Sequence, residues 1–243
     1  MSEIKMTFVA TVKGMTLDNK IKPQRIKSFY PDWLKQMPFK IEQKGEYNEP
    51  TNLLTAKSCP SFIHWFQNGY VIPAWADMRI QYNPATGTWY WRIGREMNSY
   101  SVDIHHDKQL LDHTEVKFLG RTASKVFKLV CPWRLITPSG YSVYQMPMFY
   151  HFNNEWVTMP GIIDTDVWHE INQQILYFGN GQEVFIKKGS PLAHYIPFKR
   201  EKSAIEIREQ TDEDNLYFEG TRLKVLTEDR AGYLNLDRVE NGN

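Results

Sequence analysis

The sequence predicts a mainly β protein of the sandwich, jelly-roll or clip-like barrel type. Aromatic residues make up 14% of its 243 residues, and aromatic side chains favour pleated, half-buried surfaces. Short runs of alternating apolar and polar residues recur along the chain, and residues typical of turns separate them. Apolar residues account for 42% of the chain and charged residues for 23%, which is an ordinary balance for a globular protein of this size.

Residues 1–57 are expected to form an N-terminal basic arm and packing segment. A first strand is predicted over residues 6–12, where apolar and polar residues alternate. Four basic residues between positions 20 and 27 form a cluster that we interpret as a solvated face, because no glycine-rich or aromatic partner accompanies it. Residues 40–57 lack periodicity and are predicted to be a loop.

One short helix is predicted over residues 60–69, at the start of a β-rich core domain that we assign to residues 58–200. Ser58 is a candidate cap for its first turn, and Pro60 suits the first helical position. Gly69 suits the position just after the last turn.

Strands are expected through the rest of this core domain. They span residues 70–72, 78–82, 88–93, 100–104, 127–130, 134–137, 141–146, 161–164, 174–178, 183–186 and 191–197. Turn residues at 83–87 predict that the strands on either side of them form a hairpin. The Asn180-Gly181 pair predicts a second hairpin, which joins residues 174–178 to residues 183–186.

The last segment, residues 201–243, differs from the rest in charge. It carries six basic and eleven acidic residues, whereas the chain as a whole has a net charge of +1. Such an acidic extension is expected to lie at the periphery and to dock on its own body or on a partner. Residues 204–207 are predicted to start a short helix or an edge strand.

Composition also argues against several classes of protein. The near-neutral net charge gives no strong signal for nucleic-acid binding. Cys59 and Cys131 are too few for a disulfide framework, so reduced thiols are expected. No apolar run reaches membrane-spanning length, and the N-terminus lacks the apolar core of a signal peptide. We therefore expect a soluble protein that no signal peptide directs to secretion and that does not bind membranes.

Several short motifs in order resemble one uncharacterised family. The motifs are Pro31-Asp32-Trp33, Cys59-Pro60-Ser61-Phe62, Gly69-Tyr70-Val71-Ile72-Pro73, His105 with Gln109, Pro132-Trp133, Thr137-Pro138-Ser139-Gly140-Tyr141-Ser142-Val143, Gly161-Ile162-Ile163-Asp164-Thr165-Asp166, Lys188-Gly189-Ser190-Pro191-Leu192-Ala193 and Ile196-Pro197-Phe198-Lys199-Arg200. The family is known only as a domain of unknown function in tailed phages and some bacteria. The resemblance implies a phage protein located in the cytoplasm of an infected host or in the virion, and it implies no established activity.

The centre of the chain is also similar to the core of dUTPases and dCTP deaminases. A Ser-Gly turn, the motif at residues 161–166, a hairpin and the motif at residues 188–193 follow one another as they do there. This resemblance implies a β-clip barrel that forms homo-oligomers, usually trimers. It also implies that Asp164 activates water or orients a base, that Ser139 and Gly140 form the phosphate-side turn, and that a metal such as Mg²⁺ carries the phosphates of a nucleotide.

The chain departs from the dUTPase-like pattern at three places. Pro138 stands where those enzymes have an arginine before Ser-Gly, and Val167 stands where they have an aromatic residue. Their glycine-rich C-terminal motif is replaced by the acidic segment, which would repel a triphosphate. These departures leave the implied fold intact but argue against the implied activity.

Asp164 and Asp166 are the candidate catalytic residues. Since side chains two positions apart on a strand share a face, both carboxylates are expected to point the same way. They would then share a metal ion or provide a base with a raised pKa. The alternative is structural, with Asp164 hydrogen-bonded to the turn and Asp166 solvated.

Two further groups of residues are candidates for binding. His105, Asp107 and His194 resemble the two-histidine, one-carboxylate set of non-haem iron oxygenases. The charged surroundings of the first two also fit an exposed loop, and histidine clusters more often bind no metal. Trp168 and His169, like the segment 153–156, place aromatic rings beside polar groups, which suits a ligand groove, a protein interface or core packing.

The leading functional prediction is a phage-type, non-enzymatic binding or assembly protein, either a virion component or a host-interaction factor. It implies protein partners or self-association. The alternative is a metal-dependent nucleotide hydrolase or deaminase-like enzyme built around Asp164. A non-haem iron oxygenase that uses His105 and Asp107 is the third hypothesis.

Overall fold

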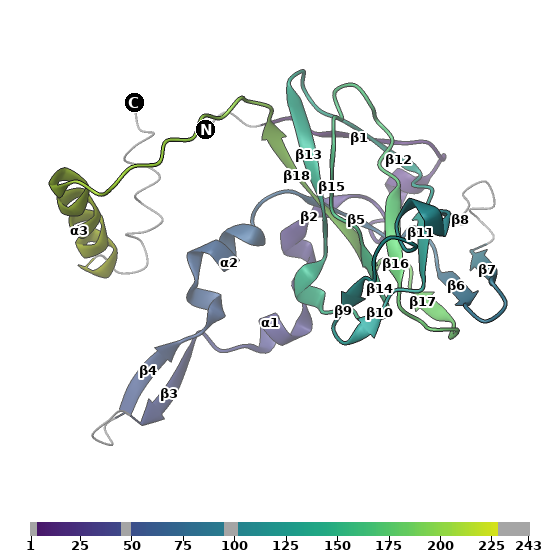
Figure 1. The fold of residues 1–243 in the computed structure, drawn as a ribbon, viewed down its shortest axis with the longest axis horizontal. Coiled ribbons are helices and arrows are strands. Elements are labelled where there is room, and N and C mark those ends of the chain that lie inside the picture. Colours follow the sequence, from purple (N-terminus) through teal and green to yellow (C-terminus); the bar gives the residue numbers. More distant parts are fainter. Residues whose placement is uncertain (1–3, 45–49, 95–101, 228–243) are drawn as a thin grey trace. The chain divides into compact units, whose positions relative to one another are not determined.

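The computed structural model describes residues 4–44, 50–94 and 102–227, and it is mainly β (Figure 1). The chain divides into two compact units. The larger unit holds residues 4–31 and 68–200, and the smaller one holds residues 1–3, 32–67 and 201–243. The three segments inferred from the sequence, 1–57, 58–200 and 201–243, stay a prediction about independent domains.

The larger unit contains sixteen strands among its described residues. They are β1 (Thr7–Ala10), β2 (Gln24–Arg25), β5 (Tyr70–Pro73), β6 (Met78–Asn83), β7 (Thr88–Ile93), β8 (Val102–Ile104), β9 (Lys117–Phe118), β10 (Arg121–Thr122), β11 (Lys125–Leu129), β12 (Trp133–Ile136), β13 (Tyr141–Pro147), β14 (Trp156–Thr158), β15 (Gly161–Ile163), β16 (Gln173–Tyr177), β17 (Val184–Ile186) and β18 (Pro191–Lys199). Its short 3-10 helices are η1 (Met15–Leu17), η2 (Ile26–Phe29), η5 (Asp107–Gln109) and η6 (Phe149–His151).

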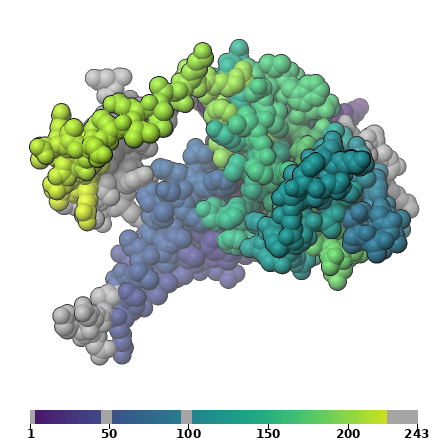
Figure 2. Space-filling model, viewed as in Figure 1, coloured from purple at the N-terminus to yellow at the C-terminus, as the bar shows by residue number. Residues whose placement is uncertain are grey.

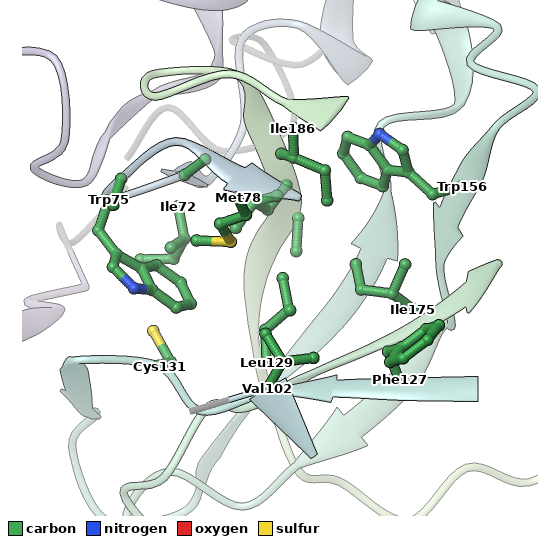
Figure 3. Packing of buried hydrophobic residues seen from close by; sticks show 14 of the residues in the cluster. Ile72, Trp75, Met78, Val102, Phe127, Leu129, Cys131, Trp156, Ile175 and Ile186 are labelled. Atoms are coloured by element: carbon green, nitrogen blue, oxygen red, sulfur yellow. The ribbon is translucent and has the colours of Figure 1, made fainter. Parts of the chain in front are cut away.

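Three antiparallel sheets organise the larger unit. Their strand orders are β15-β13-β18-β5-β2, β14-β16-β11-β8 and β17-β6-β7. Alternation in the sequence explains which residues face inward: along β6, buried residues alternate with more exposed ones. Side chains from all three sheets meet in one apolar core. Figure 3 shows part of it, with Ile72, Met78, Phe127, Leu129, Ile175 and Ile186.

In the space-filling view, segments coloured teal and green, from the middle and later parts of the chain, make up most of the visible surface of this unit (Figure 2). The mainly β prediction is confirmed, and the arrangement is consistent with the predicted β-clip-like core. The strand expected at residues 100–104 appears as β8, and its first two residues lie outside the described part of the chain.

The smaller unit contains the remaining elements. They are α1 (Asp32–Gln36), β3 (Lys40–Lys44), β4 (Pro50–Leu54), η3 (Ala56–Ser58), α2 (Pro60–Trp65) and α3 (Asp212–Thr227). Helix α2 confirms that a short helix starts at Pro60, which occupies its first turn as expected. The predicted end at Gly69 is wrong, because the helix ends at Trp65 and Phe66 takes the C-terminal cap position. The predicted cap is wrong, because Ser58 donates its hydroxyl to the Thr55 carbonyl at 2.5 Å and Cys59 takes the cap position.

Two other segments of the smaller unit differ from prediction. The expected loop at 40–57 contains the β3–β4 hairpin, in which Ile41 lies opposite Leu53. Residues 204–207 form neither helix nor strand, and the helix begins later, at Asp212. Thr211 and Asp214 account for this start, because each side chain accepts a hydrogen bond from the other's backbone amide.

The predicted hairpin around Asn180-Gly181 is also wrong. Asn180 and Gly181 do adopt positive φ values of 46° and 89°, so the chain turns there as expected. The flanking strands nevertheless belong to different sheets, since β16 lies between β14 and β11 whereas β17 pairs with β6. With both edges of β16 occupied, β17 has no free edge of that strand to join.

Among the residues that the structure describes, no helix is both long and apolar enough to span a membrane.

Candidate functional site

The predicted carboxylate pair lies immediately after β15, at one edge of the five-stranded sheet. The strand ends at Ile163, and the next residues form a turn in which the Asp164 carbonyl accepts from the amides of Val167 and Trp168 at 2.9 and 2.8 Å. The expectation that Asp164 and Asp166 alternate on a strand is therefore wrong. Their carboxylates are nevertheless brought together, because both contact the same cation.

That cation is the guanidinium of Arg200, which directly follows β18. It donates from Nη1 to Asp166 Oδ1 at 2.8 Å and from Nη2 to Asp166 Oδ2, so the ion pair is bidentate. Its Nη1 also lies 3.3 Å from Asp164 Oδ1 and donates to Ser142 Oγ at 2.8 Å. One arginine thus links both members of the predicted catalytic pair.

Asp166 is the more tightly held of the two carboxylates. Its side chain is only 7% exposed. Besides Arg200, the backbone amide of Gly140 donates to its Oδ2 at 2.8 Å. The hydrogen bonds from Arg200 and then from Gly140 lower the pKa of Asp166 to about 2. This carboxylate is therefore ionised at neutral pH and is not the base with a raised pKa that the sequence suggested.

Asp164 is the accessible member of the pair. Its side chain is 57% exposed, and the buried Ser142 donates its hydroxyl to Asp164 Oδ1 at 2.5 Å. The structural alternative assigned the two roles the other way round. Asp164 is the solvated carboxylate, and Asp166 accepts a hydrogen bond from the Ser139-Gly140 turn.

The predicted phosphate-side turn, Ser139-Gly140, does lie beside the pair. Gly140 has a φ of 83°, which a glycine adopts without strain, and the Arg200 amide donates to its carbonyl at 2.8 Å. Since the Gly140 amide already donates to Asp166, it is not open to a phosphate oxygen. Ser139 is exposed in this turn.

Trp168 and His169, the other predicted ligand-binding residues, follow the same turn. Trp168 is 62% exposed. His169 is held by Nδ1 against the Thr165 carbonyl at 2.9 Å, and its own carbonyl accepts from Leu135 at 3.0 Å. The structure therefore places Trp168 on the surface and His169 in a structural contact.

A divalent cation such as Mg²⁺ does not fit this arrangement. Both oxygens of Asp166 already accept from Arg200, and the positive guanidinium stands beside Asp164. A second cation between the carboxylates would be repelled by the positive charge of Arg200. Arg200 was not predicted as the partner of the pair, because 34 residues separate it from Asp166 and no local motif links them.

The predicted iron-binding set is not brought together. His105 lies within 3.2 Å of Gln109 Oε1, and Asp107 forms an ion pair with the buried Lys125 at 2.7 Å. His194 is fully buried in β18, with its Nε2 2.6 Å from the Asn68 carbonyl. The described residues contain no group of three or more His, Cys, Asp or Glu side chains that could hold a metal ion.

A separate cavity of about 390 Å³ opens at the segment 153–156, for which the sequence suggested a ligand groove as one possibility. Aromatic rings and polar groups line it together, among them Phe149, Asn153, Trp156 and Phe185. It does not include Asp164 or Asp166, so it is a candidate region separate from the carboxylate pair.

No protein-family model matches the chain, and no curated protein matches it. Among solved structures, the native dUTPase of EIAV is similar at 10% identity and a TM-score of 0.32, over 60% of this chain and 87% of that one. The dUTPase of phage phi11 of S. aureus matches at 10% identity and a TM-score of 0.27, over 46% and 98%. The dUTPase of Staphylococcus bacteriophage 80alpha matches at 10% identity and a TM-score of 0.26, over 48% and 99%.

Proposed function

We propose that this chain is a non-enzymatic binding or assembly protein that associates with further copies of itself through the β15 edge of its five-stranded sheet. The observation that carries the proposal is the pairing of the predicted catalytic carboxylates with Arg200. Arg200 binds Asp166 tightly and also contacts Asp164, so we interpret the three residues as a structural tie between the segments that follow β15 and β18. A role as virion component or host-interaction factor fits this proposal and comes from the resemblance of the sequence to phage proteins.

The proposed interface patch comprises four exposed apolar residues: Tyr144 on β13, Ile162 on β15, and Val167 and Trp168 in the segment that follows Asp166. Their exposed fractions are 39%, 60%, 76% and 62%. Tyr144 lies opposite Ile162 across the β13–β15 pair, so both side chains stand on one face of the sheet. Exposed apolar side chains with aromatic rings among them are typical of protein interfaces.

The position of β15 favours self-association over other uses of this patch. It is the outermost strand of its sheet, so one side of its backbone has no strand partner within the described chain. No charged residue or proline interrupts Gly161–Ile163, although such residues commonly protect an edge. Antiparallel pairing of β15 with its own copy would join two sheets across a two-fold axis.

Sedimentation velocity over a range of protein concentrations tests the association. We expect the wild-type protein to form an oligomer and Ile162→Asp to stay monomeric. Leu17→Asp is the matched control, since Leu17 is 84% exposed and lies outside the patch. A wild-type protein that is monomeric at every concentration would overturn the proposal, as would an oligomer that Ile162→Asp leaves intact.

The second candidate function is a nucleotide hydrolase or deaminase-like enzyme, and the accessibility of Asp164 favours it. The pure protein would be incubated with a panel of nucleoside triphosphates and Mg²⁺, beside Asp164→Asn. The binding proposal predicts no turnover by either protein. Turnover by the wild type that Asp164→Asn abolishes would establish the enzyme instead.

The tie itself is tested with Arg200→Gln. This change removes the cation that both carboxylates share, so we expect a lower melting temperature. Lys202→Gln is the control, because it removes the same charge from an exposed residue two positions further along the chain, outside the tie. A melting temperature as high in Arg200→Gln as in the control would show that the tie has no structural role.

A further inference from the structure

The cavity of about 390 Å³ at the segment 153–156 is built entirely by the larger unit. It lies among the end of β13, the loop that precedes β14, and β17. Its volume is within the roughly 300–1,000 Å³ of small-molecule sites. The β15 edge contributes none of its lining, so a ligand site in this cavity is independent of the proposed interface.

Aromatic rings form much of its wall, and two of them are accessible. Phe149 and Phe185 are 47% and 42% exposed, whereas Trp156 is 8% exposed. Phe149 also packs edge-on against Phe118, another lining residue, at 6.4 Å between ring centroids. Arg79 covers Phe185, with its guanidinium carbon 4.7 Å from the ring centroid. The cavity therefore offers supported, half-exposed ring surfaces to an incoming molecule.

An acidic, a basic and an amide side chain belong to the same lining: Glu155, Lys187 and Asn153. Neither the Glu155 carboxylate nor the Lys187 ammonium has an ion-pair or hydrogen-bond partner within the described part of the chain. The Asn153 carboxamide oxygen accepts from the Glu155 amide at 2.9 Å and from the Trp156 amide at 3.4 Å. Its NH₂ group makes no such contact there and is available as a donor. These three side chains thus supply one carboxylate acceptor and two donors, and their charges sum to zero.

This combination selects a class of ligand. A hydroxyl group both donates and accepts, so a molecule with several hydroxyls can satisfy Glu155, Lys187 and Asn153 together. Half-exposed rings suit a flat face of C–H groups. The charges of Glu155 and Lys187 sum to zero, so these two residues give the cavity no net attraction for an anionic nucleotide. We propose that this cavity binds a neutral carbohydrate, with a sugar ring against Phe149 or Phe185 and hydroxyls on Asn153, Glu155 and Lys187.

Saturation-transfer NMR on the full chain tests the proposal with three panels: neutral mono- and disaccharides, nucleosides, and aromatic amino acids. We expect transfer to the ring protons of at least one sugar, with its strongest signals on one face of the ring. No transfer to any sugar would overturn the proposal. Preferential binding of a nucleoside or an amino acid would also overturn it, by identifying a different occupant.

Variants then locate the site. Phe149→Ala, Phe185→Ala and Glu155→Gln alter exposed side chains, and each is expected to weaken the binding of that sugar about tenfold, which corresponds to loss of one good contact. Phe218→Ala is the matched control, since Phe218 is 56% exposed on α3 and lines no part of this cavity. Circular dichroism verifies that each variant is folded. Unchanged binding in all three cavity variants would overturn the assignment.

Discussion

We expect acid to destabilise the larger unit through His194, the buried histidine of β18. Burial lowers its pKa to about 4, from an ordinary value of 6.5. Its Nε2 lies 2.6 Å from the Asn68 carbonyl, a contact in which the ring donates. Protonation would place a positive charge in a site that has no exposed surface.

The sign and size of the effect follow from these two pKa values. Above pH 6.5 the ring is neutral in both states, and its contribution to stability is fully present. As the pH falls from 6.5 towards 4, the unfolded chain binds a proton that the folded chain does not, so the free energy of unfolding decreases. At about 1.4 kcal/mol per pKa unit the full loss is about 3 kcal/mol, and about 2 kcal/mol of it occurs by pH 5.

Urea unfolding at pH 7.5, 6.5, 5.5 and 5.0 measures this loss, with His194→Gln as the comparison. The glutamine amide retains a donor for the Asn68 carbonyl but does not titrate. Contributions from carboxylates are common to both proteins and cancel in the difference. We expect the wild type to lose about 2 kcal/mol more than His194→Gln between pH 7.5 and 5.0. Equal losses in the two proteins would refute the assignment of this pH dependence to His194.

Two further predictions concern backbone fit and thiol burial. Gly69→Ala would place a Cβ 2.3 Å from the Tyr195 carbonyl oxygen at a φ of +82°, so we expect a destabilisation of about 2–5 kcal/mol. The control Gly14→Ala, with a φ of +88° and open space around it, should cost only about 1–2 kcal/mol in the same denaturant titration; equal costs would show that the close approach is relieved. Burial raises the pKa of Cys131 to about 12, whereas Cys59 is exposed. A colorimetric thiol assay should therefore titrate one thiol in the native protein and two in denaturant, and rapid reaction of both in the native state would contradict the packing.

Local pairing was predictable from the sequence, whereas distant pairing was not. The β6–β7 hairpin follows from alternation on both sides of a short turn, and its register runs from Met78 opposite Ile93 to Asn83 opposite Thr88. The Asn180-Gly181 pair is an equally typical hairpin turn in the sequence, but the two strands that it connects belong to different sheets. Whether two consecutive strands form a hairpin depends on which other strands pair with each of them. For β16 and β17 those partners are β11, β14 and β6, and no local pattern reveals them.

The candidate site shows the same division. A motif located Asp164, Asp166 and the Ser139-Gly140 turn, and the structure does place them together. The residue that determines their chemistry is Arg200, which reaches them from the end of another strand. The start of helix α3 could have been predicted from the sequence, because Thr211 precedes Asp214 by the three positions of a capping box.

The central position of β18 has a consequence for how the protein is made. This strand pairs with β13 on one side and with β5 on the other, and 126 residues separate Asn68 from its contact, His194. On the ribosome, β5 is therefore synthesised long before β18 emerges. Until then its apolar residues Val71 and Ile72 lack the strand that pairs with them in the folded protein. A nascent chain interrupted before Pro191 would carry open sheet edges, which invite pairing with other chains. Synthesis of β18 is thus the step that allows β13 and β5 to join in one sheet.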